Sequence, residues 1–199
     1  MPDTGAPHFI PFLDGTELVR AYPDFSEDLA DAVADGLSAA GGLVAVKSAI
    51  FTGIQSASVT AGSNVAVTDL TITHEVADPA NKLIISAFFG VAANSEGGGN
   101  VGLAIHDGAG LIAIGGADGT RTRVSAGGAS SSANADRVVT NPSITFVHTP
   151  GTGSKTYTVR AINISLSTRT LAINRTTDDT NSSARSRAVS SLVIQEVAV

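Results

Sequence analysis

The sequence has 199 residues, no cysteine and a formal net charge of −6. The absence of cysteine excludes a disulfide scaffold, a Cys-ligated zinc site and a thiol nucleophile, and the acidic balance argues against general nucleic-acid binding. Val, Ile, Leu and Phe make up about a quarter of the chain, which is enough for a hydrophobic core. No apolar run reaches the roughly 18 residues of a membrane span. Residues 1–15 also lack the basic start and apolar stretch of a secretory signal.

The charge is unevenly distributed along the chain. Residues 1–42 hold eight acidic residues and one basic residue, whereas residues 119–199 hold nine basic residues and four acidic ones. Such an asymmetry is typical of a separate structural unit or tail. We therefore expect two parts, an N-terminal arm over residues 1–42 and a folded domain over residues 43–199.

The first 23 residues contain four of the seven prolines, which disfavour helix and favour extended backbone. An extended peptide cannot bury its own apolar side chains, so this arm must lie on another surface. That surface is either its own β-domain or a partner, such as another protein or a sister subunit. The residues that would anchor the arm to a partner are Phe9, Ile10, Phe12, Leu13, Leu18 and Tyr22.

A short helix is expected after the arm. Asp24 is a suitable N-cap, with Glu27 at the spacing of a capping box, and Gly41 and Gly42 end the pattern. An apolar stripe recurs every four residues, at Phe25, Leu29, Val33 and Leu37. A helix this short is marginal alone. It needs packing against its own domain or against copies of itself around a symmetry axis.

From residue 43 onward the apolar pattern changes to period two, which predicts a mostly β domain of antiparallel strands arranged as a sandwich or jelly roll. No stretch of this part has a helical period. The expected strands are Leu43–Ile50, Ser56–Thr60, Val65–Val76, Lys82–Ala92, Val101–Ile105, Leu111–Gly115, Thr120–Ser125, Arg137–Thr140, Ile144–Thr149, Lys155–Ser165, Thr170–Asn174 and Ala188–Val197.

Turn signals separate several of these strands. Asp107-Gly108 and Asp118-Gly119 are typical of hairpins, and Pro150–Ser154 links another pair. In Val65–Val76 the alternation slips once, which predicts a β-bulge near Asp69.

Two low-complexity loops, residues 94–100 and 126–135, are either solvated linkers or recognition loops at one end of the sandwich. If they face a receptor, the contacting residues would be Asn94, Glu96, Asn100, Ser130, Ser131 and Asn134.

No catalytic, metal or cofactor site is predicted. His8, His74, His106 and His148 lack metal-ligand spacing, although one His per subunit could meet on a trimer axis. Asp178-Asp179 lies in a polar loop without a calcium-binding ladder, and we expect it to be solvated. Residues 151–156 only superficially match a phosphate-binding loop, because a strand follows them. Without a secretory signal, three glycosylation sequons, at Asn163, Asn174 and Asn181, are interpreted as coincidences.

Two further side-chain groups have alternative interpretations. The body aromatics Phe51, Phe88, Phe89, Phe146 and Tyr157 are expected in the core rather than in a sugar-stacking surface. The basic C-terminal third includes Arg121 and Arg123 on one strand face. These arginines would bind an anionic ligand such as a polysaccharide, or, as we favour, pair with acidic residues of the arm across subunits. The remaining arginines of this third are Arg137, Arg160, Arg169, Arg175, Arg185 and Arg187.

Both ends of the chain resemble tailed-phage fibre and spike proteins. The opening Ile10–Pro23, followed by the acidic Ala-rich helix and the Gly-Gly break, looks like the start of such chains. Residues 153–161 and 190–197 are similar to the last strands of their trimeric, TNF-like β-sandwiches. The middle of the chain is generic, and no shaft is present. The resemblance therefore implies a short head fibre, decoration protein or collar spike rather than a long tail fibre.

The expected function is structural and non-enzymatic. The resemblance implies a homotrimeric virion protein, assembled in the host cytoplasm, whose arm attaches to other virion proteins while the sandwich projects outward. The first alternative is a receptor- or glycan-binding module for host attachment. A depolymerase is a second alternative, although no residue pattern selects for it. No cofactor and no membrane insertion are expected.

Overall fold

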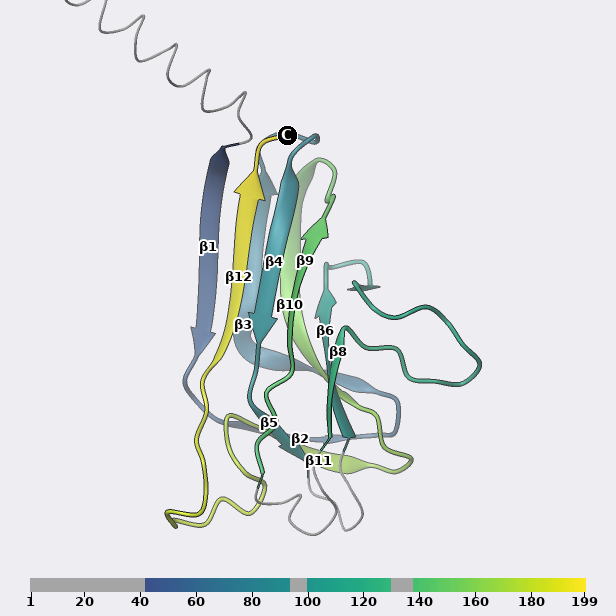
Figure 1. The fold of residues 1–199 in the computed structure, drawn as a ribbon, viewed down its shortest axis with the longest axis vertical. Helices are drawn as coiled ribbons and strands as arrows, with labels where there is room; N and C mark the ends of the chain where they lie inside the picture. Colours follow the sequence, from purple (N-terminus) through teal and green to yellow (C-terminus); the bar gives the residue numbers. More distant parts are fainter. Residues whose placement is uncertain (1–41, 94–99, 130–137) are drawn as a thin grey trace, which may run out of the picture. The chain divides into compact units, whose positions relative to one another are not determined.

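The computed structural model describes residues 42–93, 100–129 and 138–199 (Figure 1). Every described element is a β-strand, and all strand pairs are antiparallel. The strands are β1 Leu43–Phe51, β2 Gln55–Val59, β3 Asn64–Val76, β4 Lys82–Phe88, β5 Val91–Ala93, β6 Asn100–His106, β7 Leu111–Ile112, β8 Ala126–Ala129, β9 Ser143–His148, β10 Gly153–Asn163, β11 Arg169–Ile173 and β12 Ser190–Val197. The expected mostly β class is confirmed.

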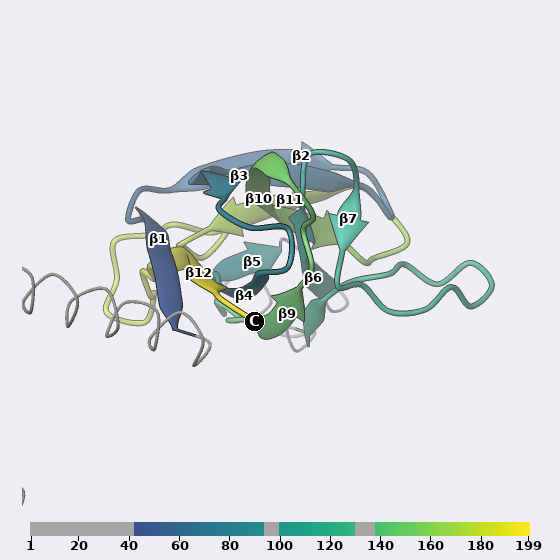
Figure 2. The ribbon, with the colours of Figure 1, turned by 90° about the horizontal axis from the view of Figure 1, so that it is seen from above.

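Two sheets face each other in a sandwich-like arrangement (Figures 1 and 2). One sheet has the strand order β1-β12-β4-β9, and the other has β3-β10-β6-β7 with β8 also paired to β6. A small sheet, β2-β11-β5, lies at one end of the sandwich in Figure 1. The C-terminus lies at the opposite end. Most neighbouring strands in the two large sheets come from distant parts of the chain, so long-range pairing holds the fold together.

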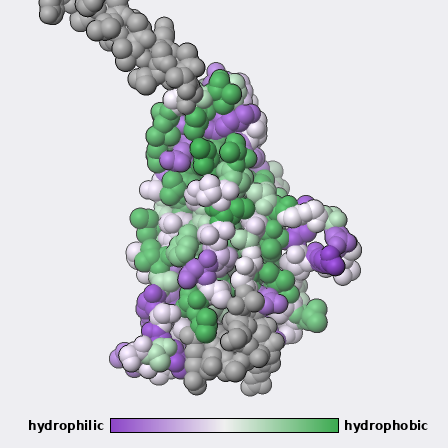
Figure 3. All heavy atoms as spheres, viewed as in Figure 1, coloured by the Kyte–Doolittle hydropathy of each residue, from purple (hydrophilic) through white to green (hydrophobic). Residues whose placement is uncertain are grey.

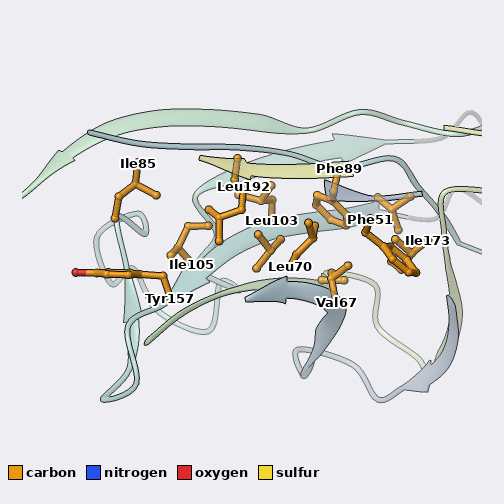
Figure 4. Close-up of a cluster of buried hydrophobic side chains, with 14 of the residues drawn as sticks. Phe51, Val67, Leu70, Ile85, Phe89, Leu103, Ile105, Tyr157, Ile173 and Leu192 are labelled. Carbon is orange, nitrogen blue, oxygen red and sulfur yellow. The ribbon is translucent and has the colours of Figure 1, made fainter. Parts of the chain in front are cut away.

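The core fills the space between the two large sheets, because alternate residues of each strand point inward. The side chains of Leu103, Ile105 and Leu192 are fully buried there, and Figure 4 shows them converging from both sheets. Full burial of one such side chain contributes roughly 1.5–3 kcal/mol. The apolar period-two pattern of the sequence therefore corresponds to the inward side of these strands.

The predicted β-bulge near Asp69 is confirmed. The register between β10 and β3 shifts after the pair of Thr158 with Thr71, and resumes where Arg160 pairs with Ala66. Asp69 lies in this shift with a φ of 60°, a conformation that Asp tolerates better than most residues. The bulge lets Val67 and Leu70 both reach the core.

The predicted single strand Lys82–Ala92 is wrong, because it is two strands in different sheets. The break falls at Phe89 and Gly90, where the chain crosses to β5. Gly90 is buried so tightly that an added Cβ would lie 2.4 Å from the Cβ of Ala188. Its N–H donates to Ser190 Oγ at 3.1 Å and its carbonyl accepts from Asn174 N at 2.8 Å. Apolar content alone did not distinguish a crossing from a continuous strand.

Three further strand predictions, all between residues 111 and 140, are wrong in their bounds. Only Leu111 and Ile112 of the first predicted strand pair with β6, and residues 120–125 form no strand. The next strand is instead β8, at the start of the predicted loop 126–135. Of the predicted strand from Arg137 to Thr140, only an isolated bridge from Thr140 to Val91 is present in the described part.

The turns at Asp107-Gly108 and Pro150–Ser154 connect paired or consecutive strands as predicted. Asp107 Oδ1 accepts hydrogen bonds from the N–H groups of Ala109 and Gly110, both at 2.9 Å. Burial opposes the charged form, but these backbone hydrogen bonds outweigh it and lower the pKa of Asp107. Gly108 and Gly151 have φ values of 95° and 72°, which favour glycine.

The predicted arm and short helix, residues 1–41, lie outside the described residues. The described residues contain no helix, so none of their segments is a helix long and apolar enough to cross a membrane. The strands described above belong to one compact unit, Leu43–Val199.

Candidate functional site

The outward side of the β1-β12-β4-β9 sheet is rich in large apolar side chains, and we call it the apolar face. Directly paired residues share a side of a sheet, so the register places Val46, Gln195, Ile84 and Val147 in one row across the four strands. The face comprises Leu43, Val46, Ser48 and Ile50 of β1; Ser191, Val193, Gln195 and Val197 of β12; Lys82, Ile84, Ser86 and Phe88 of β4; and Ser143, Thr145 and Val147 of β9.

Large apolar residues on this face are strongly exposed. Ile50 is 63% exposed and Val147 is 65% exposed, although they lie on the two opposite edge strands of the sheet. Figure 3 views the molecule from this side and shows apolar residues spread along the strands. Lys82 is the only charged residue of the face as defined above. Polar residues such as Ser86 and Thr145, whose hydroxyls lie 2.9 Å apart, separate the apolar ones. Exposed large apolar residues gathered on one face are typical of an interaction site.

Phe88 corrects one sequence prediction. It was expected in the core, but it lies on the apolar face and is 39% exposed, whereas its neighbour Phe89 is fully buried. Two consecutive phenylalanines in a strand cannot both point inward. The sequence pattern did not indicate which of the two would be exposed.

The outward side of the other large sheet has a different chemistry, and we call it the threonine face. Thr71 and Thr158 are paired across β3 and β10, with their Oγ1 atoms 3.1 Å apart, and Thr73 and Thr156 repeat the arrangement at 3.0 Å. Glu75, Arg160 and His106 lie on the same side. Hydroxyls that pair with one another and remain open to water are typical of a solvated sheet surface.

A buried polar cluster links the two sheets near one end. His74 of β3 lies 2.7 Å from Glu196 of β12, measured between Nε2 and Oε2, and both are about 1% exposed. The other carboxylate oxygen accepts from Asn81 Nδ2 at 2.7 Å and from Ala77 N at 2.9 Å. Burial alone would raise the pKa of Glu196, but the hydrogen bonds from Asn81, His74 and Ala77 outweigh burial and lower it.

A second group of titratable side chains lies around Tyr157. Its ring contacts His148 edge to face, with 5.9 Å between the ring centroids. Its hydroxyl is buried and has no hydrogen-bond partner within the described ranges. Burial together with the nearby charge of Asp107 raises the pKa of Tyr157 to about 12. Burial lowers the pKa of His148, although Asp107 opposes this effect. Tyr157 is fully buried and forms part of the core between the sheets.

His74, His106 and His148, for which no shared site was predicted, do not converge in the described strands. His74 pairs with Glu196, His148 contacts Tyr157, and His106 Nδ1 accepts from Gly108 N at 3.0 Å. The described residues contain no group of three or more His, Cys, Asp or Glu side chains that could hold a metal ion. His8 lies outside the described residues.

The loop between β11 and β12 corrects the interpretation of Asp178 and Asp179 as simply solvated. Asp179 accepts from Arg175 at 2.6 Å and from Arg187 at 2.7 Å, and Asp178 pairs with Arg185. The hydrogen bond from Arg185, helped by Thr180, holds the pKa of Asp178 well below its usual range. Three arginines that we expected to meet the N-terminal arm therefore find acidic partners in their own loop.

In two of the three sequons, the asparagine side chain donates hydrogen bonds to backbone carbonyls of the fold. Asn163 Nδ2 donates to the carbonyls of Val59 and Ser167, both at 2.8 Å. Asn174 Nδ2 donates to Phe51 O at 2.7 Å and to Gly53 O at 2.9 Å. Both asparagines are fully buried, so the fold as described leaves neither side chain accessible for glycosylation.

Most predicted contact residues fall outside the described part of the chain. These include the arm residues, the helix stripe and the loop residues Asn94, Glu96, Ser130, Ser131 and Asn134. Asn100 is described: it begins β6 and pairs with Ala129, the last residue of β8. The last residue of the predicted loop 94–100 therefore lies beside a residue within the predicted loop 126–135. Sequence reasoning missed the apolar face, although alternate valines and isoleucines on both sides of a strand would have signalled it.

No protein-family model matches this sequence, and a search among curated proteins found no significant match.

Proposed function

We propose that this chain is a structural, non-enzymatic subunit of a phage virion. It works as a homotrimer whose sandwich is the projecting head and whose residues 1–42 attach it to other virion proteins. The apolar face is the observation that carries the self-association. The resemblance of both chain ends to phage fibre and spike proteins is the basis for proposing a virion as the setting and three as the number of subunits.

A second copy of the chain fits the apolar face better than a charged partner does. With only Lys82 charged, the face offers almost no like-charge repulsion when copies meet. Ile50 and Val147 lie on opposite edge strands of the sheet, so a neighbouring copy could contact apolar side chains across its whole width. Burying such side chains stabilises an assembly by up to roughly 1.5–3 kcal/mol each.

The strand order supports a finer classification as a jelly roll. Each large sheet combines early and late strands: β1 and β12 in one sheet, β3 and β10 in the other. Successive long strands such as β3 and β4 also alternate between the sheets. A jelly roll also alternates its antiparallel strands between two sheets, which supports this classification. If the copies assemble with their strands roughly parallel to the symmetry axis of the oligomer, one end of each sandwich stays free.

The native mass of the purified full chain tests the oligomer. We expect three times the chain mass of 20.0 kDa, independent of dilution through the micromolar range. A monomer at these concentrations would overturn both the trimer and the role of the apolar face. A stable dimer would keep the face but overturn the number of subunits.

Removal of residues 1–23 tests the anchor. We expect the truncated chain to keep the β-sheet signal and native mass of the full chain, yet to be absent from particles assembled in its presence. Full incorporation of the truncated chain into particles would contradict the anchoring role.

The alternative is a receptor- or glycan-binding module for host attachment. The observation that favours it is the pairing of Asn100, the last residue of the predicted loop 94–100, with Ala129 of the predicted loop 126–135. Shortening both loops to turns should abolish host-cell binding if they carry recognition. Unchanged binding would exclude the loops as the contact site.

A further inference from the structure

A groove lies beside the threonine face, between β10 and the segment that joins β7 to β8. Its floor is apolar and is formed by Leu111, Ile114 and Ile162, and its volume is about 400 Å³. That volume lies within the roughly 300–1,000 Å³ of small-molecule sites. Figures 1 and 2 show that the β7–β8 segment projects from the body. Residues 120–123 of this segment line the groove.

Backbone hydrogen bonds hold the base of the β7–β8 segment. Gly115 N donates to Val124 O at 3.2 Å, and Ser125 N donates to Leu103 O at 2.7 Å. Val124 packs so closely on Gly102 of β6 that an added Cβ would lie 2.4 Å from Val124 Cγ1. Gly102 therefore allows the β7–β8 segment to lie directly on the sheet, which keeps one wall of the groove in place.

Two arginines on this wall give the groove a positive charge. Arg123 Nε donates to Gly115 O at 2.6 Å, and the guanidinium has no acidic partner among the described residues. Arg121 pairs with Asp118, but these side chains are 81% and 67% exposed, and exposed pairs contribute little. The contrast with the β11–β12 loop is clear, because there Asp178 and Asp179 neutralise most of the arginine charge.

The remaining polar groups of the groove suit hydroxyl-bearing ligands. Asn64 offers an amide, and Thr120 and Thr122 offer hydroxyls, all lining the same space as the arginines. An apolar floor accommodates the C–H face of a sugar ring, amides and hydroxyls match sugar hydroxyls, and a guanidinium matches a carboxylate in a two-pronged hydrogen bond.

We propose that this groove binds a saccharide that carries a carboxylate, with Arg123 as its main charged contact. Arg121 is a second contact, reached by exchange of its exposed bond to Asp118. The site lies outside the apolar face, so it remains open when that face is covered. Binding at this groove does not depend on self-association. The native mass tests the trimer and the ligand titration tests the groove, so either proposal can be overturned without the other.

The test is a titration of the full-length protein with small ligands, in which saturation-transfer NMR measures binding. The probes are D-glucuronate and a hyaluronan tetrasaccharide, with D-glucose and sodium sulfate as neutral and inorganic comparisons. We expect both carboxylated sugars to bind, glucose to bind at least tenfold more weakly, and sulfate to compete only weakly. Tighter binding of the tetrasaccharide than of glucuronate would point to a polymer as the source, and equal binding to a single sugar unit; both outcomes support the site.

Variants locate the binding in the groove. Arg123→Ala should weaken glucuronate binding at least fivefold, and Ile114→Ser should weaken glucose and glucuronate alike. The control is Arg187→Ala, an arginine in the β11–β12 loop that is similarly exposed and lies outside the groove. Equal weakening by Arg123→Ala and Arg187→Ala would show a general charge effect and overturn the site. Sulfate competing as well as glucuronate, or no binding of either acid at millimolar concentration, would also overturn it.

Discussion

The two outer faces of the sandwich differ in how many large apolar side chains they expose. On the threonine face, side chains such as Thr71 and Thr158 pair their hydroxyls and meet water, as the open side of an antiparallel sheet usually does. On the apolar face, Ile50 and Val147 expose hydrocarbon to the surroundings. Both faces come from strands with the same alternation, so the fold alone does not demand the difference. Under the proposed function, the apolar face is used for assembly and the threonine face stays open to water.

The largest effect is expected where the two sheets are joined. Glu196→Ala leaves His74, Asn81 and the backbone N–H of Ala77 without their shared acceptor, all in a buried position. Removal of one partner from a buried pair costs about 3–5 kcal/mol. Denaturant unfolding at fixed protein concentration measures the loss. The matched control is Glu75→Ala on the threonine face, which should change stability by less than about 0.5 kcal/mol.

The same carboxylate predicts an acid-sensitive link between the sheets. Its pKa is lowered in the folded protein, so its stabilising contribution is complete above the unfolded value near 4.5 and is lost as the pH falls through the folded value. We expect the wild type to lose stability below about pH 4.5 more steeply than Glu196→Gln does. Parallel pH profiles for the two proteins would contradict the assignment.

The next largest effect is expected on the apolar face. Ile50→Asp combined with Val147→Asp places charges on the two edge strands of this face without touching the core. We expect at least a hundredfold weaker self-association, which corresponds to about 2.7 kcal/mol, seen as a fall to the monomer mass at low micromolar concentration. Thr71→Asp on the threonine face is the control and should keep the native mass. Loss of assembly with the control as well would show that the two faces do not differ in function.

A smaller effect is expected at the end of the sandwich, where one asparagine joins three segments. Asn174 donates to the carbonyl of Phe51, the last residue of β1, and to that of Gly53, and it accepts from Ser190 Oγ of β12. Asn174→Ala leaves buried carbonyls without donors, and its φ of 60° disfavours alanine, for a combined cost of about 2 kcal/mol. Thermal unfolding measures it. Asn181→Ala, in an exposed sequon, should be neutral, and equal destabilisation by both would count against this role.

The sequence predicted what depends on local pattern. Alternating apolar residues located most strands, and the slip near Asp69 located the bulge, because inward positions repeat every second residue. The crossing at Gly90 depends on a close contact with Ala188, a residue nearly a hundred positions away, and no local pattern encodes it. The apolar face has the same origin: Val46 and Ile84 become a surface only once β12 lies between β1 and β4. The groove likewise needs Ile162 and Arg123 to meet across the fold.

The smallest effect is expected on the threonine face itself. Thr71→Val with Thr158→Val keeps the shape of both side chains and removes one hydroxyl pair that water can replace. Cross-strand pairs of this kind contribute roughly 0.2–1 kcal/mol, and valine's preference for strands offsets part of the loss. We expect unfolding free energy within about 0.5 kcal/mol of the wild type and an unchanged native mass. A larger assembly would mean that hydroxyls alone keep this face from associating, so that exposed hydrocarbon anywhere on the sandwich suffices and the apolar face is not a specific surface.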